Sequence, residues 1–249
     1  MEYERPIVLS IAGLDPCGGA GLLADIKTIE QHQCLGFGVT TAITCQTEDR
    51  FESVRWLAEN EIICQIEPLL QQYDVAAVKI GLIQNTQTLE RILDILIARG
   101  IAKIVWDPVL AASAGFEFNN HGDTIAFPQL LRKVTLITPN LQEAIYLTNK
   151  DNPVSAARTL SNYTNVLLKG GHHPTDQGTD YLFIQSQRIS LPPIAKQIYS
   201  KHGSGCILSS SIASSLAKNQ SFESACTNAK FYIEKVLAST PNLLAYHHV

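Results

Sequence analysis

A short run of small residues leads into a cysteine at residues 203–206, His202 standing just before it, and an apolar run without proline or charge follows. That pattern is typical of a turn that feeds a helix start, where unpaired N–H groups and the helix dipole attract anions. Gly203, Ser204 and Gly205 therefore suit a cradle for a phosphate. Cys206 would lie at its mouth, where the field favours the thiolate. A plain loop-to-helix junction with a packed cysteine would also fit.

Acidic residues near two predicted strand ends suit a divalent cation. Asp107 ends the apolar stretch Ile104–Trp106, and an ionised carboxylate there is costly unless it meets a cation, donors or a metal. Asn140 and Glu143 lie three residues apart across a predicted helix start, so they project near one another. Asp107 and Glu143 would suit Mg²⁺, which takes few protein carboxylates and keeps waters. Glu143 would equally suit a first-turn acid that stabilises the helix dipole.

Lys169 closes the apolar run Val166–Leu168 and precedes two glycines. A lysine at the end of a buried strand should reach a polar cleft, and phosphate is one natural partner for its ammonium group. The alternative is an edge lysine whose apolar stem packs while its amine extends into solvent.

A second glycine-rich loop, Gly18–Gly21, opens the first predicted helix and contains the spacing Gly-x-Gly-x-x-Ala of dinucleotide sites. The loop is long for that use, and the second strand ends at Gln46 without an acid for a ribose. We expect instead that this backbone approaches a substrate, or that its glycines let the helix pack closely. Asp25, one turn into the helix, would point back towards the loop or face solvent.

Several familiar sites are missing from the sequence. There is no phosphate-binding Gly-x-x-x-x-Gly-Lys-[Ser/Thr] motif, no His-Glu-x-x-His, and no Cys/His set with zinc-ligand spacing. His172 and His173 are adjacent in a predicted strand exit, where side chains usually point apart, and His247–His248 are expected to be an inert tail.

Composition narrows the class of protein. The 249 residues carry a formal net charge of −4 and no run of Lys or Arg, which argues against a nucleic-acid partner. No stretch approaches about 20 uncharged apolar residues, so no membrane span is expected. The first residues lack a signal-peptide pattern, and six scattered cysteines indicate reduced thiols, so we expect a cytoplasmic protein.

Strands and helices alternate along the chain. Predicted strands cover 7–12, 39–45, 54–57, 75–80, 104–106, 134–138 and 165–169, with an edge hairpin at 181–184 and 188–191. Predicted helices follow Gly21, run through 62–70 with a kink or restart at Pro68, begin at caps Asn85, Asp123, Ser155 and Ser221, and cover 141–147 and 206–218. This alternation predicts an α/β fold, one domain over 1–249, with a mostly parallel central sheet and helices on both faces. Ligands of such sheets bind at the carboxyl ends of the strands.

The chain resembles the hydroxymethylpyrimidine and phosphomethylpyrimidine kinases of the ribokinase-like superfamily. The resemblance rests on ordered motifs that together span nearly the whole chain: residues 10–21 with 24–28, Val78–Leu82, Asp107–Val109, Ile137–Ala144, Leu168–His172 and His202–Ser209. It implies a three-layer α/β/α fold and a homodimer. It also implies ATP- and Mg²⁺-dependent phosphorylation of the hydroxymethyl group of a 4-amino-2-methylpyrimidine, and of its monophosphate, in thiamine biosynthesis.

The resemblance also implies roles for single residues. Ala20, Asp25 and Gln46 match contacts to the pyrimidine, and Leu82 and Val109 match its apolar walls. Asp107, Asn140 and Glu143 match the Mg²⁺-phosphate region, Lys169 the phosphate-binding lysine, and 203–205 the anion hole. Cys206 stands where most superfamily relatives place a catalytic aspartate and where the pyrimidine kinases have cysteine; as thiolate it would take the proton from the attacking hydroxyl.

Departures from the family pattern fall mainly in the substrate loops, at Leu14, Cys17 and Thr47–Asp49; Ser204 replaces a threonine. Three other functions stay open at this point. A related pyridoxal kinase would share the motifs. A thiol hydrolase would use Cys206 as a nucleophile at a helix N-terminus. A non-catalytic pyrimidine-binding protein would use the same pocket without turnover.

Overall fold

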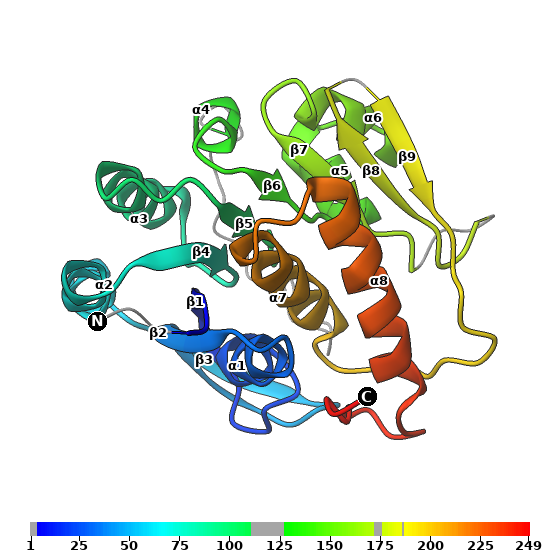
Figure 1. Cartoon of the computed structure of the whole chain (residues 1–249), viewed down its shortest axis with the longest axis horizontal. Coiled ribbons are helices and arrows are strands. Elements are labelled where there is room, and N and C mark those ends of the chain that lie inside the picture. Colours follow the sequence, from blue (N-terminus) through cyan, green and yellow to red (C-terminus); the bar gives the residue numbers. More distant parts are fainter. Residues whose placement is uncertain (1–3, 111–126, 172–175, 186) are drawn as a thin grey trace.

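The computed structural model describes residues 4–110, 127–171, 176–185 and 187–249. Predictions for Asp123 and for His172–His173 lie outside these ranges. Within them, one nine-stranded sheet runs through the molecule in the order β3-β2-β1-β4-β5-β6-β7-β8-β9 (Figure 1). The strands are β1 (Ile7–Leu14), β2 (Leu35–Gln46), β3 (Phe51–Trp56), β4 (Val75–Ile80), β5 (Ile104–Trp106), β6 (Leu136–Ile137), β7 (Asn165–Leu168), β8 (Asp180–Ile184) and β9 (Gln187–Leu191).

The centre of the sheet is parallel and its edges are antiparallel. Strands β2, β1, β4, β5, β6 and β7 pair in parallel, whereas β3, β8 and β9 pair antiparallel with their neighbours. The predicted mostly parallel sheet and the predicted edge hairpin of β8 and β9 are therefore confirmed. Strand β1 lies between β2 and β4, which is the place where the strand order reverses and where ligands bind in such sheets.

Helices cover both faces of the sheet (Figure 1). They are α1 (Gly21–Gln31), α2 (Glu59–Gln72), α3 (Thr86–Ala98), α4 (Phe127–Leu131), α5 (Leu141–Thr148), α6 (Pro153–Leu160), α7 (Ser204–Ala217) and α8 (Phe222–Ala238). Two apolar cores follow from this arrangement. Ile7, Leu9 and Ile11 of β1 join a core with α2 to α6, while Val8 joins a core with α1, α7 and α8. Alternate side chains of a strand point to opposite faces, so the apolar run of β1 supplies both.

Some helix starts agree with the sequence prediction and others do not. Asn85 and Ser221 cap α3 and α8 as predicted, because their side chains accept hydrogen bonds from the N–H groups of Thr88 and Ser224. Ser155 was predicted to cap α6, but Asn152 does so, accepting from the Ser155 N–H at 2.9 Å. Pro153 follows at the first helical position, which its fixed φ suits.

Pro68 neither ends nor restarts α2, which is one helix from Glu59 to Gln72. Proline removes the hydrogen bond from its own N to the carbonyl group of residue 64. Both Pro68 and Cys64 are exposed, so water can satisfy that carbonyl group and the rest of the helix continues.

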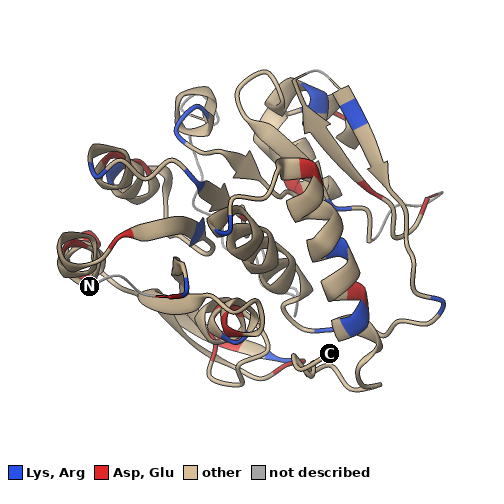
Figure 2. Cartoon of the chain, viewed as in Figure 1, with Lys and Arg blue, Asp and Glu red and all other residues tan. Residues whose placement is uncertain are grey.

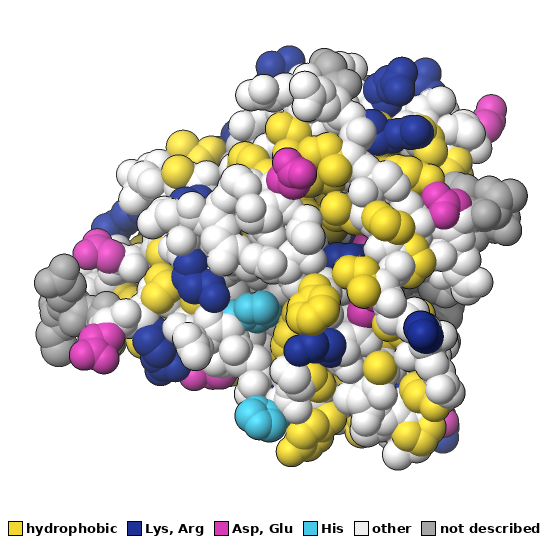
Figure 3. All heavy atoms as spheres, turned by 45° about the vertical axis from the view of Figure 1, so that its right-hand side comes forward, with side chains coloured by type: hydrophobic (Ala, Val, Ile, Leu, Met, Phe, Trp, Pro, Cys, Tyr) yellow, Lys and Arg dark blue, Asp and Glu magenta, His cyan; other side chains and the backbone are white. Residues whose placement is uncertain are grey.

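Charged residues of both signs occur throughout the described part of the chain. Lys and Arg are spread over several elements and alternate with Asp and Glu (Figure 2), and on one side of the molecule apolar side chains are interspersed among them (Figure 3). Within the described residues, no helix is long and apolar enough to span a membrane.

The C-terminal segment, residues 239–249, packs onto the molecule instead of hanging free, so the expectation of an inert tail is wrong for its backbone and for His247. The carbonyl group of Leu243 accepts the N–H of His202 at 2.9 Å. His247 is buried, with Nδ1 3.4 Å from Thr28 Oγ1, and its carbonyl group accepts the Tyr232 hydroxyl at 3.1 Å. The segment therefore ties α1 and α8 to the loop before α7.

The buried histidine predicts an acid-sensitive C-terminal segment. Burial, with a smaller effect of Lys27, lowers the pKa of His247 to about 4. Because the pKa of His247 is lower in the folded than in the unfolded protein, its neutral, buried imidazole stabilises the fold above about pH 6.5. This contribution, about 3 kcal/mol of unfolding free energy in total, is lost as the pH falls from about 6.5 through 4. We expect His247→Gln to flatten the fall in the free energy of unfolding between pH 6.5 and 4, measured by urea denaturation. An unchanged pH dependence would contradict the burial of a neutral imidazole.

Candidate active site

Most of the predicted site residues lie at or just after the carboxyl ends of β2, β4, β5 and β7 and at the starts of α5 and α7. Helix α7 lies against β1, β4 and β5 (Figure 1). Helix α7 begins at Ser204, two residues before the predicted start, and Gly203 is its N-cap with φ of 75°. The first turn of α7 lies beside the strand-end residues Asp107 and Lys169, where its unpaired backbone N–H groups would attract an anion.

Two close approaches fix the place of this cradle. A Cβ placed on Gly203 would lie 2.1 Å from the carbonyl oxygen of Gly19 and 2.7 Å from Ala20 Cβ. A Cβ on Gly205 would lie 3.2 Å from Lys169 Nζ and 3.6 Å from Asp107 Oδ2. The start of α7 thus contacts the first glycine loop on one side and the charged strand ends on the other, and glycine is the residue that permits both contacts.

Gly203→Ala should separate the two glycine loops. The new methyl group would meet backbone, which cannot give way, in a left-handed conformation that already disfavours alanine. We expect the free energy of unfolding to fall by more than about 2 kcal/mol and kcat to fall about 100-fold. Gly100→Ala is the matched control, since Gly100 has φ of 76° but nothing within 4 Å of its Cβ position. Equal effects of the two substitutions would show that the contact is unimportant.

Lys169 joins two carboxylates that are far apart in sequence. Its Nζ lies 2.8 Å from Asp107 Oδ1 and 3.6 Å from Glu143 Oε2. Burial opposes the charged form of Asp107, yet the ammonium groups of Lys169 and Lys79 hold the pKa of its carboxyl below the usual range. Burial likewise opposes the charge of Lys169, but Asp107 and Glu143 raise its pKa above the usual range. The cluster is a fixed set of opposite charges at the edge of the cradle.

Glu143 has a second task. Its Oε2 accepts the backbone N–H of Asn140 at 2.6 Å, and the Asn140 side chain accepts the N–H of Glu143 at 2.9 Å, which is a capping box at the start of α5. Burial raises the pKa of Glu143 to about 7, Lys169 opposes this rise and Asp107 adds to it. Both interpretations of Glu143 in the sequence are thus compatible with its position: it caps a helix, and it faces Asp107 across one lysine.

This donor set fits a magnesium ion. Asp107 and Glu143 are buried carboxylates on either side of Lys169, and Mg²⁺ prefers oxygen ligands of this kind. Thr138 was not singled out as a site residue, although its hydroxyl donates to Asp107 Oδ1 at 3.0 Å and orients that carboxylate. The sequence signal for Thr138 was its position as a polar residue directly after an apolar strand.

Cys206 lies in the first turn of α7, half-buried beside charged groups. Burial raises the pKa of its thiol to about 11; Lys79 lowers it, while Asp25 and Asp107 raise it further. The thiolate expected from the helix start is therefore not the favoured form in the free protein, because burial opposes its charge.

Asp15 connects the first glycine loop with His202, the residue that precedes the cradle. Its Oδ2 accepts the N–H groups of Gly19 and Ala20 at 3.1 and 2.8 Å and lies 3.0 Å from His202 Nε2. Burial opposes its charge, but hydrogen bonds from His202, Cys17 and the loop backbone lower the pKa of Asp15 to about 2. Cys17 Sγ donates to Asp15 Oδ1 at 3.1 Å, so this departure from the family pattern keeps a hydrogen bond.

An apolar cluster lies beside Gln46. Leu82 and Ala42 pack with the partly buried Phe51, Val54, Trp56 and Val109. Gln46 is half-buried at the end of β2 and pairs with Phe51 across the β2–β3 hairpin. The structure therefore brings the predicted wall residues Leu82 and Val109 together. Phe51 and Trp56 of this cluster were not predicted from the sequence. The signal for them was an aromatic residue at each end of the short strand β3.

Asp25 is the predicted site residue whose surroundings differ most from expectation. It neither faces solvent nor points to the glycine loop, but is fully buried beside Lys79, with their charged atoms 2.7 Å apart. Lys79 belongs to the family motif Val78–Leu82 but had been given no role from the sequence. A lysine inside the apolar strand Val75–Ile80 was the signal that a carboxylate partner must lie nearby.

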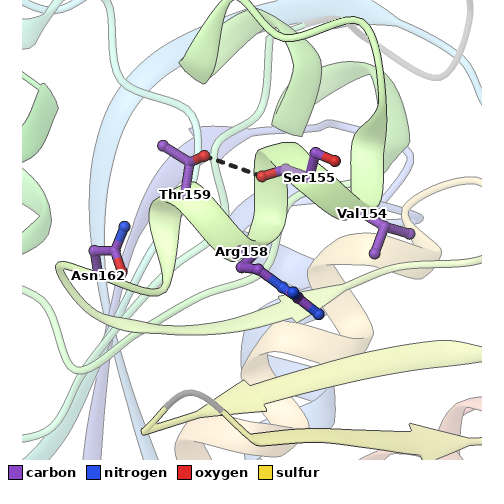
Figure 4. A pocket seen from close by; sticks show the side chains of 5 residues that line it. All are labelled: Val154, Ser155, Arg158, Thr159 and Asn162. Atoms are coloured by element: carbon purple, nitrogen blue, oxygen red, sulfur yellow. Dashed lines mark hydrogen bonds between the residues drawn. The ribbon is translucent and has the colours of Figure 1, made fainter.

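A cavity of about 510 Å³ lies elsewhere, on the surface of α6. Val154, Ser155, Arg158, Thr159 and Asn162 line it, and the Thr159 hydroxyl donates to the Ser155 carbonyl group at 3.0 Å (Figure 4). None of the predicted site residues borders it.

Comparison with known proteins identifies the family of the chain. Residues 15–249 match the family model described as phosphomethylpyrimidine kinase. The chain is 33% identical over 247 residues to the hydroxymethylpyrimidine/phosphomethylpyrimidine kinase of Rhizobium meliloti strain 1021, with 95% of this chain and 92% of the relative covered.

Two solved structures are also similar. The pyridoxal kinase from Staphylococcus aureus in complex with ADP aligns with a TM-score of 0.86 at 26% identity, covering 99% of this chain and 94% of that one. Phosphomethylpyrimidine kinase from Clostridium difficile 630 aligns with a TM-score of 0.77 at 29% identity, covering 92% and 98%.

Proposed function

The chain belongs to the phosphomethylpyrimidine kinase family, and from this membership and its site we propose that it transfers the γ-phosphoryl group of ATP to the hydroxymethyl group of 4-amino-5-hydroxymethyl-2-methylpyrimidine, and then to the resulting monophosphate, in thiamine biosynthesis. It is a ribokinase-like phosphotransferase. The observation that carries the proposal is the meeting of the α7 cradle with Lys169, Asp107 and Glu143 beside an apolar cluster that ends at Gln46.

The apolar cluster suits the pyrimidine ring. Leu82 and Val109 would contact the faces of the ring, while the Gln46 amide, which both donates and accepts, would pair with ring nitrogen and exocyclic amine. Ala20 lies against Gly203, so a ring bound beside Ala20 would lie next to the cradle, where its hydroxymethyl group could reach the phosphoryl group. This arrangement would hold the attacking oxygen near the phosphoryl group, and positioning of that kind is a large part of phosphoryl-transfer catalysis.

The phosphate groups would meet fixed positive charge. The N–H groups of residues 203–206 and the Lys169 ammonium group would stabilise charge that develops on the γ-phosphoryl oxygens. Asn140, at the start of α5, would contact the nucleotide phosphates beside Glu143. Asp107 and Glu143 would hold Mg²⁺, which neutralises phosphate charge when bound. Cys206 would accept the hydroxyl proton, which requires its thiolate.

Substrate comparison tests the proposal against its nearest rival. Similarity to pyridoxal kinase structures keeps pyridoxal as the alternative substrate. With ATP and Mg²⁺, we expect a higher kcat/KM for the hydroxymethylpyrimidine than for pyridoxal, measured by ADP release with mass-spectrometric detection of the product. A preference for pyridoxal would replace the proposed substrate, and no product from either would refute kinase activity.

We also propose that the chain acts in the cytoplasm as one domain in a homodimer, as the family resemblance implies. Light scattering after gel filtration should then give about twice the 27.3 kDa chain mass, and a single cooperative unfolding transition would support one domain.

A further inference from the structure

We propose that Asp25 and Lys79 are positioning residues for the phosphoryl site, in which Asp25 fixes the first turns of α7 and Lys79 supplies a permanent positive charge beneath them. The inference deepens the proposed function, because it assigns to the reaction a buried pair that the sequence had placed at the substrate or left without a role.

The hydrogen bonds of Asp25 join three elements around α1. Its Oδ1 accepts the Ser210 hydroxyl of α7 at 2.7 Å. Its Oδ2 accepts the Ser10 hydroxyl of β1 at 2.6 Å and the Lys79 ammonium group of β4 at 2.7 Å. Both carboxylate oxygens are thus occupied, and the side chain is fully buried. A carboxylate held in this way is a structural tie between α7 and the sheet.

The tie acts close to the reacting groups. Ser210 lies four residues after Cys206, so both project from the same face of α7, one turn apart. The charges of Asp25 and Lys79 are also among those that shift the pKa of the Cys206 thiol. A movement of α7 at Ser210 would therefore move Cys206 and the N–H groups of residues 203–206 relative to Lys169.

Lys79 is placed to act on the cradle as well as on Asp25. It is fully buried, and a Cβ added to Gly81 would lie 2.8 Å from its Nζ, at the carboxyl end of β4. In the described part of the chain, Asp25 is the one acceptor that its three ammonium protons meet. Its charge is felt by Asp107 and by Cys206. A buried ion pair adds little net stability compared with apolar residues. We therefore attribute the position of the Asp25–Lys79 pair beside the cradle to its role in orienting α7.

Two variants on neighbouring serines separate this role from general packing. Ser210→Ala removes the tie to Asp25 without creating an unpaired charge. Ser211→Ala is the matched control, because Ser211 is equally buried on α7 but its hydroxyl lies 2.8 Å from His32 Nε2, away from Asp25. We expect Ser210→Ala to lower kcat roughly tenfold with KM for both substrates within about threefold, and Ser211→Ala to leave both constants unchanged.

The role of the Lys79 charge is tested by replacing Asp25 and Lys79 together. Asp25→Asn with Lys79→Met leaves no unpaired buried charge, so the protein should fold with an unchanged Tm, while kcat falls about 100-fold and the Kd of the pyrimidine stays within about threefold. An unchanged kcat in this double variant, equal behaviour of the two serine variants, or loss of pyrimidine affinity in place of kcat would each overturn the inference.

The reactivity of the Cys206 thiol tests the tie between Asp25 and Ser210 even if the protein is not a pyrimidine kinase. If the wild-type protein phosphorylates no pyrimidine, the proposed function fails, and the tie is judged by iodoacetamide alkylation of Cys206 in the free protein. The rate should change at least about threefold in Ser210→Ala and stay constant in Ser211→Ala, because only the first serine restrains that turn of α7. Equal rates in all three proteins would overturn the inference.

Discussion

Replacing Cys206 with alanine is expected to lower kcat by a factor of about 10² to 10⁴, the usual contribution of a positioned general base, while the Kd values of ATP and of the pyrimidine stay within about threefold. The thiol is half-buried at the start of α7, and its neighbours at the cradle remain in place when only the sulfur is removed. Titration calorimetry would give the affinities and a coupled assay of ADP release the turnover.

The pH profile gives a sharper form of the same prediction. Burial raises the pKa of the Cys206 thiol to about 11, so the reactive thiolate is scarce near neutral pH. We expect kcat/KM of the wild-type protein to rise about tenfold per pH unit between pH 7 and 9, and the residual activity of Cys206→Ala to lack this rise. A flat wild-type profile would show that Cys206 does not act as the base.

Cys226→Ala is the matched control for the loss of a thiol. Cys226 is fully buried on α8 and belongs to the core between α7 and α8, so its removal should change stability without changing kcat. The same set of proteins separates the other functions that the sequence left open. A hydrolase would form a covalent acyl adduct on Cys206, and a binding protein would bind the pyrimidine while the wild-type protein released no ADP.

Lys169→Met is expected to have the largest combined effect on stability and turnover. It leaves the buried carboxylates Asp107 and Glu143 facing each other without their shared cation. Breaking a buried ion pair by removing one partner costs about 3–5 kcal/mol of unfolding free energy, and loss of one charge donor at the reacting phosphoryl group lowers kcat by about 10² to 10³. Added Mg²⁺ should recover part of the stability, since the two carboxylates would hold it.

Lys133 supplies the control for this prediction. It also bridges two carboxylates, Glu90 and Asp94, but at the surface, where their side chains are half-exposed. Lys133→Met should cost less than about 1 kcal/mol because water screens the remaining charges. Similar losses in the two variants, or a Lys169→Met protein whose stability ignores Mg²⁺, would contradict a buried cation site.

The fold was largely predictable from local pattern. Apolar runs such as Val75–Ile80 and Ile104–Trp106 are strands with the predicted bounds, because a strand buried on both faces needs an uninterrupted apolar run. Strand order was not predictable, since register depends on contacts between segments far apart in sequence. Single helices show the same limit: α2 continues through Pro68 without a restart, and Asn152, not the predicted Ser155, caps α6, with Pro153 at the first helical position.

The site was predictable where the chemistry follows from one segment. The cradle at 203–206 and the strand-end charges Asp107 and Lys169 meet as the sequence indicated. Asp25 was not predictable in this way, because its environment is set by Ser10, Lys79 and Ser210, which approach only in the folded protein. The protonation of Cys206 was also beyond the sequence, since it depends on how much water the folded site excludes.

The most direct test of the account is the product formed from ATP, Mg²⁺ and 4-amino-5-hydroxymethyl-2-methylpyrimidine by the wild-type protein, identified by phosphorus NMR and mass spectrometry. The account predicts the pyrimidine monophosphate with one ADP released for each molecule formed, and rates of formation of both at least about 100-fold lower in Cys206→Ala and Lys169→Met. Release of ADP without a phosphorylated pyrimidine, or full activity in either variant, would contradict it.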